Sequence, residues 1–503
     1  MTRRTRDDAG SAPIATARAI LGDVRNGDGI PLALSYDDVM LVPRRSGIRS
    51  RSDVETSTRF TRGITLAMPM VSANMDTITG AEMAIAMARV GAIGVIHRFL
   101  SVEDQVREIT RVKRAEAVVI EDPHGVGPDA TLGQVRDEAA RHGVTGLLVV
   151  DGRRRLLGIV TSRDMRLRDD PSMPVTALMT PRERVVVGTP TTGGAEATDL
   201  LRDARVEKLP LVDEDDVVVG LVTLRDLMQR ADRPGATLDA RGHLAVAAAI
   251  GVRGDHLERA RALVDAGADA LVLDIAHGHA DHAIEALEAV RETVGGDCDL
   301  VAGNVATAEG ARDLVAAGAD AVKVGVGPGS VCTTRVVAGV GVPQLSAVLE
   351  CAEVCREHGV PVIADGGIRS GGDVAKAIGA GAETVMVGNL LAGTPESPGE
   401  VVTREGVRLK VFRGMASGSA AAARRAAEGE DETEFTPIVP EGVEAAAPLR
   451  DSAGQVVHEL VGGLRSGMSY SDARTIREMN EKARFVRITA GGLRESHPHD
   501  VTL

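Results

Sequence analysis

The feature of this sequence that most limits its fold is a regular alternation of short apolar runs with amphipathic helical stretches. Each run ends in Gly, Asp or Asn, the pattern of a buried parallel strand followed by a turn and a helix. Two runs occur early, at residues 68–76 and 92–98. The six later runs are LAVAAAIGV, ALVLDIAHGH, LVAGNVAT, AVKVGVGPGS, PVIADGGI and TVMVGNL. Eight such units predict an α/β fold, a closed (β/α)8 TIM barrel with functional groups at the strands' carboxyl ends.

Between the second and third predicted strands lies an insert, residues 112–232, that contains an internal repeat. GLLVVDGRRRLLGIVTSRDM at 146–165 recurs as KLPLVDEDDVVVGLVTLRDL at 208–227, and each copy predicts a hairpin followed by a helix. The copies, about 112–172 and 173–232, resemble a tandem pair of CBS domains, which bind adenine nucleotides between their repeats. Packing against neighbouring subunits is the alternative. The Thr-x-Arg-Asp turn in both copies favours ligand binding.

The insert divides the predicted barrel into residues 1–111 and residues 233–503. The larger part contains a predicted flap, residues 413–442, and a polar carboxyl-terminal tail. The flap includes an Ala-, Arg- and Glu-rich run without strand character, which is typical of a lid or a disordered segment.

Composition and charge exclude several classes of protein. A formal net charge of -14 argues against a protein that binds nucleic acid or a membrane surface, because phosphates are repelled on average. The four cysteines have no paired framework or metal-ligand spacing, which indicates free thiols in a reducing compartment. Cys351 and Cys355, spaced i, i+4, are expected in the core. Without a secretory signal or membrane span, the chain is expected to be cytoplasmic.

The most informative loop, VKVGVGPGSVCTTRVVAGVGVPQ at 322–344, begins within the sixth predicted strand. Gly325, Gly327 and Gly329 permit backbone conformations that turn carbonyl and N–H groups toward a ligand. Cys332 follows at the mouth of the barrel, where a thiolate is a strong nucleophile. An arbitrary cysteine is more often a small core residue, but the flanking Gly-x-Gly-Pro-Gly and Thr-Thr-Arg sequences favour catalysis.

Two later loops have the features of a phosphate site. ADGGIRSGGD at 364–373 and VGNLLAGT at 387–394 follow the seventh and eighth strands. Small residues at these two positions let backbone N–H groups approach an anion. Either glycine pair alone could be only a turn, but their occurrence at both strands favours a phosphorylated ligand.

Three polar residues are further candidates. Asp274 and Asn304 end the fourth and fifth strands, where they either meet a second ligand or stabilise their own loops. The sequence favours neither alternative. Glu441 follows the Ala-rich run, and an isolated Glu is normally a solvated surface residue. Its position beside a lid and opposite the cysteine nevertheless suggests proton transfer.

Together these residues resemble the inosine monophosphate (IMP) dehydrogenase and guanosine monophosphate (GMP) reductase superfamily, from LSYDDVMLVPRRS at 34–46 to ESHPHD at 495–500. The resemblance implies an oxidoreductase in which Cys332 attacks carbon 2 of a bound purine, with Thr334 and Glu441 transferring protons. It implies that the nucleotide is held by Ser330, Asp365, Gly367, Gly388, Asn389, Gly414 and Met415.

The resemblance also implies a nicotinamide cofactor near Asp274 and Asn304, and a homotetramer that sometimes pairs into an octamer. It implies a monovalent cation, K+, in the cysteine loop. The residues implied for that cation are the carbonyls of Gly327, Gly329 and Cys332, and Glu495, Ser496 and His497 in the tail of a neighbouring subunit.

Two reactions suit this family. Dehydrogenases oxidise IMP to xanthosine monophosphate with NAD and must hydrolyse the cysteine adduct, for which they carry an Arg-Tyr pair on the flap. Residues 424–442 contain no Tyr, so Arg424 and Arg425 lack that partner. Segments 44–60 and 72–77 also resemble reductases, whereas the CBS insert and the ESHPHD tail are usual in bacterial dehydrogenases.

A missing catalytic base affects turnover directly, whereas an accessory domain can be kept for regulation. We therefore predict a CBS-containing GMP reductase of purine salvage that uses NADPH to convert GMP to IMP and ammonia. The alternative is an IMP dehydrogenase with an altered flap. A third hypothesis, from a different class, is a catalytically idle adenine-nucleotide sensor.

Overall fold

The structure is a computed structural model that describes residues 30–115, 119–120, 122–166, 168–231, 233, 235–422 and 439–498. The chain forms two compact units. The barrel unit comprises the described residues up to Lys113, Gly235–Asp239, and those from Leu244 onward. The insert unit comprises the described residues of Arg114–Pro234 together with Ala240–His243.

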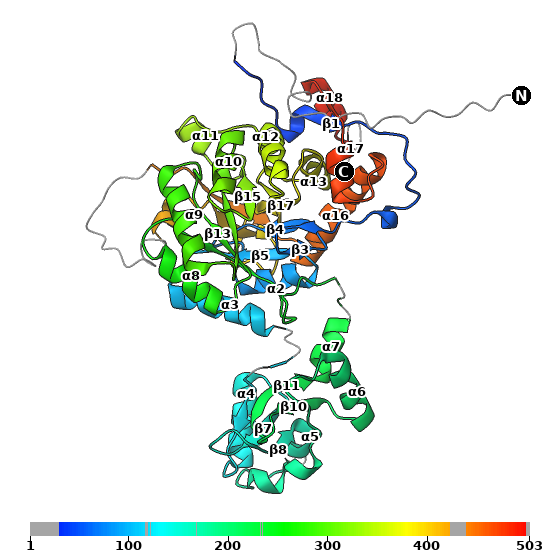
Figure 1. Cartoon of the computed structure of the whole chain (residues 1–503), viewed down its shortest axis with the longest axis vertical. Coiled ribbons are helices and arrows are strands. Elements are labelled where there is room, and N and C mark those ends of the chain that lie inside the picture. Colours follow the sequence, from blue (N-terminus) through cyan, green and yellow to red (C-terminus); the bar gives the residue numbers. More distant parts are fainter. Residues whose placement is uncertain are drawn as a thin grey trace, which may run out of the picture. The chain divides into compact units, whose positions relative to one another are not determined.

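Eight parallel strands close into a barrel in the order β12-β13-β14-β15-β16-β17-β4-β5 (Figure 1). They are β4 (Met70–Ser72), β5 (Ile93–Ile96), β12 (Ala247–Ile250), β13 (Ala270–Leu273), β14 (Asp299–Val305), β15 (Ala321–Val324), β16 (Val362–Asp365) and β17 (Thr384–Val387). Seven strands lie within predicted runs, and β14 begins one residue before its run, so the predicted barrel is confirmed.

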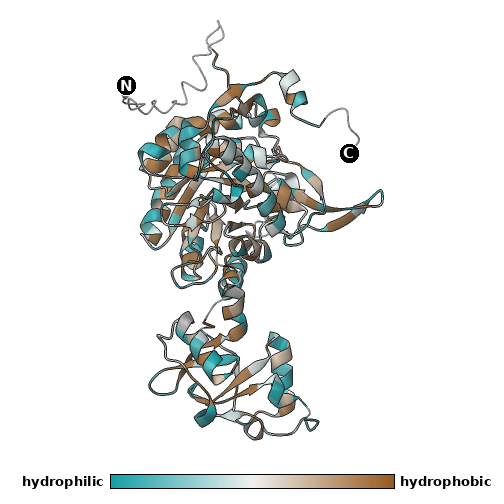
Figure 2. Cartoon of the chain, turned by 90° about the vertical axis from the view of Figure 1, so that its right-hand side faces the viewer, coloured by the Kyte–Doolittle hydropathy of each residue, from teal (hydrophilic) through white to brown (hydrophobic). Residues whose placement is uncertain are grey.

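Helices surround these strands, and Figure 2 shows hydrophilic residues on their outer faces. They are α2 (Ala81–Arg89), α3 (Val102–Arg114), α8 (His256–Asp265), α9 (Asp281–Val294), α10 (Ala308–Ala316), α11 (Thr334–Val337), α12 (Gln344–Glu357), α13 (Gly371–Gly379) and α14 (Asn389–Ala392). Cys351 and Cys355 of α12 are buried, as predicted. Within the described residues, no helix is long and apolar enough to span a membrane.

The barrel interior is filled mainly by small and β-branched side chains at alternate strand positions. Ala245, Ala247 and Ala249 point inward with Val301 and Ile363, among others, in one buried cluster. Because inward-facing residues recur every second position, the next inward positions lie closer to the carboxyl ends of the strands. In β15 and β16 that position is occupied by a charged residue, which places polar groups at the mouth.

Additional elements flank the barrel. After β17, β18 (Val401–Arg404), β19 (Val407–Arg413) and β20 (Glu444–Pro448) form an antiparallel sheet. The pairing of Arg413 with Glu444 brings the two ends of the segment between them together. The other elements of this unit are η1 (Tyr36–Asp38), β1 (Val39–Leu41), η2 (Arg51–Asp53), β2 (Thr58–Arg59), β3 (Thr65–Leu66), α16 (Ala453–Tyr470), α17 (Ile476–Lys482), β21 (Phe485–Arg487) and α18 (Ala490–Glu495).

The insert unit has the predicted repeat: the hairpins β7–β8 and β10–β11 are each followed by a helix, α5 and α7 respectively. The hairpins share a buried cluster that includes Leu148 and Ile159 from one copy and Val218 and Leu221 from the other. The unit contains β6 (Gly125–Val126), α4 (Leu132–His142), β7 (Gly146–Val150), β8 (Leu156–Thr161), α5 (Ser162–Met165), η3 (Val175–Ala177), β9 (Thr180–Pro181), η4 (Arg182–Arg184), α6 (Gly194–Ala204), β10 (Lys208–Val212), β11 (Val218–Thr223) and α7 (Leu224–Ala231).

Glu383, which precedes β17, predicts a pH dependence of stability. Its carboxylate accepts the Val362 N–H at 2.9 Å and lies 3.4 Å from Arg59, with 19% of the side chain exposed. Burial raises the pKa of Glu383 to about 7, above the value of about 4.3 in an unfolded chain. Between a pH of about 4.3 and a pH of about 7, the folded state therefore binds more protons than the unfolded state. The contribution of Glu383 to the free energy of unfolding falls as the pH rises through this range.

We expect Glu383→Gln to remove this dependence, because the amide oxygen still accepts the Val362 N–H without a buried charge. At pH 8 the variant should be more stable than wild type by roughly 1–3 kcal/mol. Thermal unfolding at pH 8 and at pH 5.5 would measure the difference, which should shrink at the lower pH. A variant that is equally destabilised at both pH values would contradict this account.

Candidate active site

The loop after β15 depends on glycine at its first position. Gly325 has φ +151°, and a Cβ there would lie 2.1 Å from the backbone oxygen of Asp365 at the end of β16. Both atoms belong to backbone held in the barrel wall, so neither moves readily. This close approach fixes the direction in which the chain leaves β15 toward Cys332.

Cys332 is partly exposed, and its Sγ lies 3.2 Å from the hydroxyl oxygen of Thr334. Its backbone N–H donates to the carbonyl oxygen of Gly329 at 3.1 Å, which closes a turn before the thiol. The thiol and hydroxyl are thus within hydrogen-bond distance, an arrangement suited to proton exchange beside a nucleophile.

The segment around Glu441 is bound directly to the cysteine loop. The Thr333 N–H donates to the Glu441 carbonyl at 2.8 Å, and the Val443 N–H donates to the Val331 carbonyl at 3.0 Å. The structure therefore brings Cys332, Thr334 and the backbone of Glu441 together, which are the three residues the sequence predicts to be catalytic.

The segment that begins at Gly414 joins the same arrangement. The Gly414 N–H donates to the Val443 carbonyl at 3.1 Å, and the Glu441 N–H donates to the Ala416 carbonyl at 3.0 Å. Both ends of the predicted flap thus lie against the cysteine loop. Arg424 and Arg425 lie outside the described residues.

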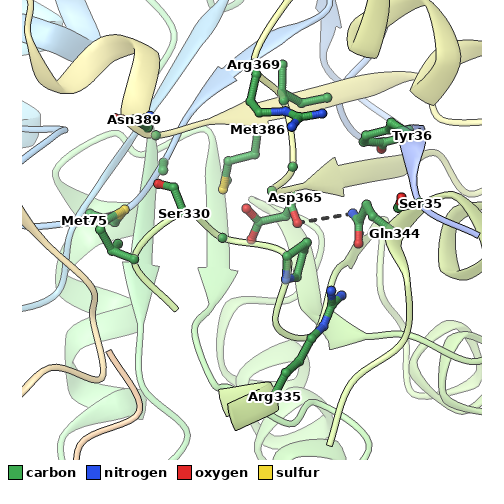
Figure 3. A pocket seen from close by; sticks show the side chains of 18 of the residues that line it. Ser35, Tyr36, Met75, Ser330, Arg335, Gln344, Asp365, Arg369, Met386 and Asn389 are labelled. Carbon is green, nitrogen blue, oxygen red and sulfur yellow. Dashed lines mark hydrogen bonds between the residues drawn. The ribbon is translucent and has the colours of Figure 1, made fainter. Parts of the chain in front are cut away.

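A cavity of about 280 Å³ opens beside this loop. Five residues predicted to hold the nucleotide line it, namely Ser330, Asp365, Gly367, Gly388 and Asn389. They come from the ends of β15, β16 and β17, and Figure 3 shows Ser330, Asp365 and Asn389 around one space. The other two residues predicted to hold the nucleotide, Gly414 and Met415, do not line the cavity. Cys332 does not line it either, but Gly329, Ser330 and Val331, which directly precede Cys332, do.

Sequence reasoning missed several lining residues, including Asp37 of η1. Figure 3 shows three others: Ser35, which precedes η1, Tyr36 in η1, and Gln344 at the start of α12. Within the described residues, the Tyr36 hydroxyl and the Gln344 side-chain oxygen are buried without a hydrogen-bond partner. Burial raises the pKa of the Tyr36 phenol well above its usual range, so the hydroxyl keeps its proton. These two atoms mark the cavity as a place for a polar ligand.

Asn304 and Asp274 are engaged with other side chains. Asn304 Nδ2 donates to the Gly325 carbonyl at 2.8 Å and to Asp365 Oδ2 at 2.9 Å. Asp274 Oδ2 lies 3.2 Å from Arg98 Nε. Neither Asn304 nor Asp274 lines the cavity. Their bonds connect loops at the carboxyl ends of the strands, and a role toward a cofactor stays a prediction.

Carbonyl oxygens are the donors that the cysteine loop offers to a cation. Gly327 has φ +84°, and the carbonyl of Gly329 accepts the Cys332 N–H. Backbone carbonyls of this kind suit K+. In the described residues, no group of three or more His, Cys, Asp or Glu could hold a metal ion. Glu495 ends α18, and Ser496 and His497 follow it directly.

Comparison with known proteins identifies the family. Residues 33–499 match the model of the IMP dehydrogenase / GMP reductase domain, so the chain belongs to this family. Its members are oxidoreductases that act on purine nucleotides with nicotinamide cofactors.

Relatives with either activity are equally similar to the chain. Inosine-5'-monophosphate dehydrogenase of Nitrosopumilus maritimus is 47% identical, over 93% of this chain and 98% of that protein. GMP reductase of Leishmania donovani is also 47% identical, over 94% of this chain and 98% of that protein. A crystal structure of a Trypanosoma brucei GMP reductase variant with guanosine 5'-monophosphate has a TM-score of 0.89 and 47% identity, covering 95% of this chain and 99% of that one.

The close approach at Gly325 predicts different effects of two glycine substitutions. Gly325→Ala should weaken purine-nucleotide binding at least about tenfold, the equivalent of 1.4 kcal/mol, because the added Cβ must displace the end of β16. Gly359→Ala is the control: Gly359 has φ +66°, but a Cβ there meets no atom within 4 Å. It should cost about 1–2 kcal/mol of stability and leave binding unchanged. Calorimetric titration and thermal unfolding would test both, and equal affinity in the two variants would contradict the prediction.

Proposed function

We propose that this chain is a GMP reductase that uses NADPH to convert GMP to IMP and ammonia in purine salvage. One observation carries the choice between the family's two reactions: residues 424–442 contain no Tyr. The chain thus lacks the Arg-Tyr pair that dehydrogenases use to activate water. A reductase needs no hydrolysis of the cysteine adduct, so the absence is compatible with turnover.

The cavity supports a nucleotide in a defined orientation. Gly367, Gly388 and Asn389 offer small side chains and backbone N–H groups to the phosphate, with Ser330 nearby. The Asp365 carboxylate offers acceptors to ribose hydroxyls. A nucleotide held at these points would extend its base along the 330–332 segment toward the thiol. Gly414 and Met415, which directly follow β19, are proposed to contact the base.

The proposed chemistry uses Cys332, Thr334 and Glu441. The sulfur bonds to purine carbon 2, the bond from that carbon to its exocyclic amine breaks, and the amine leaves as ammonia with a proton relayed by Thr334 and Glu441. The 3.2 Å contact between Cys332 and Thr334 supports this relay. Asp274 and Asn304 would hold the nicotinamide, and the reduced cofactor would supply the hydride that replaces sulfur at carbon 2. IMP would leave, and Cys332 would be restored as the thiolate.

We also propose that a second subunit completes the site in a homotetramer or octamer in the cytoplasm. Val336, Val337 and Val340, which follow the catalytic cysteine, are 86%, 43% and 59% exposed. Apolar exposure of this kind beside a site is typical of an interface. The proposed K+ ion would lie at the carbonyls of Gly327, Gly329 and Cys332. The tail of the neighbouring subunit would complete its coordination with Glu495 of the partner subunit, Ser496 of the partner subunit and His497 of the partner subunit.

The decisive experiment mixes the protein with GMP and NADPH in potassium buffer, and with IMP and NAD in parallel. Oxidation of NADPH with ammonia release is expected, whereas reduction of NAD with formation of xanthosine monophosphate would identify an IMP dehydrogenase. Cys332→Ala should abolish turnover. Glu441→Gln should slow ammonia release about 10²–10⁴-fold, while the control Glu444→Gln, an exposed residue of β20, should not. Normal turnover by Glu441→Gln would make Glu441 only structural.

The insert unit is proposed to be a tandem CBS pair that binds an adenine nucleotide. Thr161 and Asp164 lie 2.7 Å apart at the start of α5, and Thr223 and Asp226 form the same pair at α7. The two turns are thus built alike in both copies, which supports a shared ligand-binding role.

ATP is expected to change the activity or the assembly of the intact chain, because binding between the copies would stabilise one arrangement of the insert. Deletion of residues 114–234, which keeps Lys113 in the barrel unit, should abolish the response while basal turnover continues. Activity assays and light scattering with and without ATP would measure both effects. A deletion variant that still responds to ATP would exclude the insert as the regulatory site.

A further inference from the structure

Lys323 is a buried charged residue that the proposed chemistry does not use. It lies in β15 between β14 and β16, opposite Gly303 and Ile363. Ala321, two positions earlier, belongs to the apolar cluster inside the barrel. The period of two therefore directs Lys323 into the barrel as well, in the layer above that cluster. Its side chain is 3% exposed, and a charge so buried requires partners.

The partners of Lys323 come from both neighbouring strands. Its ammonium donates to Asp365 Oδ2 at the end of β16 at 2.8 Å, and to the side-chain oxygen of Asn304 in β14. The register of β14 shifts between Gly303 and Val305, and such an irregularity turns an additional side chain toward a partner it would otherwise miss. Three strands are thus connected through one ammonium group.

The network leaves one face of Asp365 for the cavity. Asn304 Nδ2 donates to the same oxygen, Asp365 Oδ2, at 2.9 Å. Within the described residues, no side-chain hydrogen bond reaches Oδ1. Asp365 lines the cavity and keeps 23% of its side chain exposed. In Figure 3 its carboxylate points toward the side of the cavity where Ser330 and Met386 lie.

We infer that Lys323 is a positioning residue that holds Asp365 and Asn304 in one arrangement and thereby couples the nucleotide end of the site to the cofactor end. The inference rests on the proposed function, in which Asp365 binds the nucleotide and Asn304 lies beside the nicotinamide. Without the ammonium, the Asp365 carboxylate loses its counter-charge, and the side-chain oxygen of Asn304 loses the donor that holds it. Both ends of the site should then change together.

The test compares Lys323→Met with Lys113→Met. Lys113 is the matched control, a buried lysine whose ammonium lies 2.9 Å from Asp239 and 2.6 Å from Asp269. Asp269 precedes β13, at the opposite end of the strands from the site. Both variants should unfold at a lower temperature than wild type. Only Lys323→Met should raise the KM values for GMP and for NADPH, each by about 10- to 100-fold.

Lys323→Arg should recover part of both KM values, because it keeps the charge and two or more donors. If Lys323→Met does not fold, the double variant Lys323→Met/Asp365→Asn carries the test, since it leaves no unpaired charge. Its KM for NADPH should exceed that of Asp365→Asn alone. Equal KM values for NADPH in the double variant and in Asp365→Asn would overturn the inference. So would KM values for Lys323→Met within twofold of those for Lys113→Met.

Failure of the proposed function has a different signature. GMP and IMP affinities are measured by calorimetry in the Cys332→Ala background, where no turnover is required. If wild type instead oxidises IMP with NAD, the KM values of the same variants are measured for IMP and NAD. A joint rise in both KM values still decides the role of Lys323. A wild-type chain that binds neither nucleotide would overturn both proposals.

Discussion

The hydrogen bonds between the cysteine loop and the segment 439–443 are the interaction on which the rest of the site depends. Two backbone bonds, from Thr333 to Glu441 and from Val443 to Val331, tie residues more than 100 positions apart in the sequence. Because these bonds use only backbone atoms, they fix the position of the thiol and leave the side chains for chemistry. The strand pairing of β19 with β20 supports them from outside the barrel.

The barrel provides a rigid base for this arrangement with few large side chains. Only 1% of the chain is aromatic, and the interior cluster contains six alanines among its buried residues. Small residues let eight strands close around a narrow interior. Phe60 and Leu66 pack against this cluster from a hairpin that bonds to Asp299, where β14 begins. The polar network of Lys323, Asn304 and Asp365 occupies the other end.

The periodic part of the molecule could be predicted from the sequence, and the long-range part could not. All eight strands were predictable because a buried parallel strand leaves an apolar run bounded by turn residues. The small residues after the seventh and eighth strands predicted a phosphate site, and the family resemblance assigned Ser330, Asp365, Gly367, Gly388 and Asn389 to the nucleotide. Gly414 and Met415, which follow β19, do not line the cavity. Gly414 lies against Val331 of the cysteine loop instead, where an added Cβ would be 2.9 Å from the Val331 carbonyl oxygen.

The residues missed by sequence reasoning reach the cavity through contacts that have no local pattern. Tyr36 is placed by the bond from the Lys376 ammonium to its carbonyl, 340 residues away along the chain. Lys323 did leave a signal, a charged residue at an inward-facing position of the run AVKVG, but it could not be given partners until the strand order was known. Register and pairing, rather than composition, decide which polar residues meet.

The antiparallel ladder of β19 and β20 has a consequence for how such a site evolves. It holds both ends of the intervening segment together. Insertions, deletions and exchanges between Ala416 and residue 439 therefore leave the backbone bonds that position the thiol in place. Relatives of equal similarity to this chain carry two different activities. A scaffold whose variable segment lies between fixed ends can thus change its reaction without rebuilding the fold that positions the thiol.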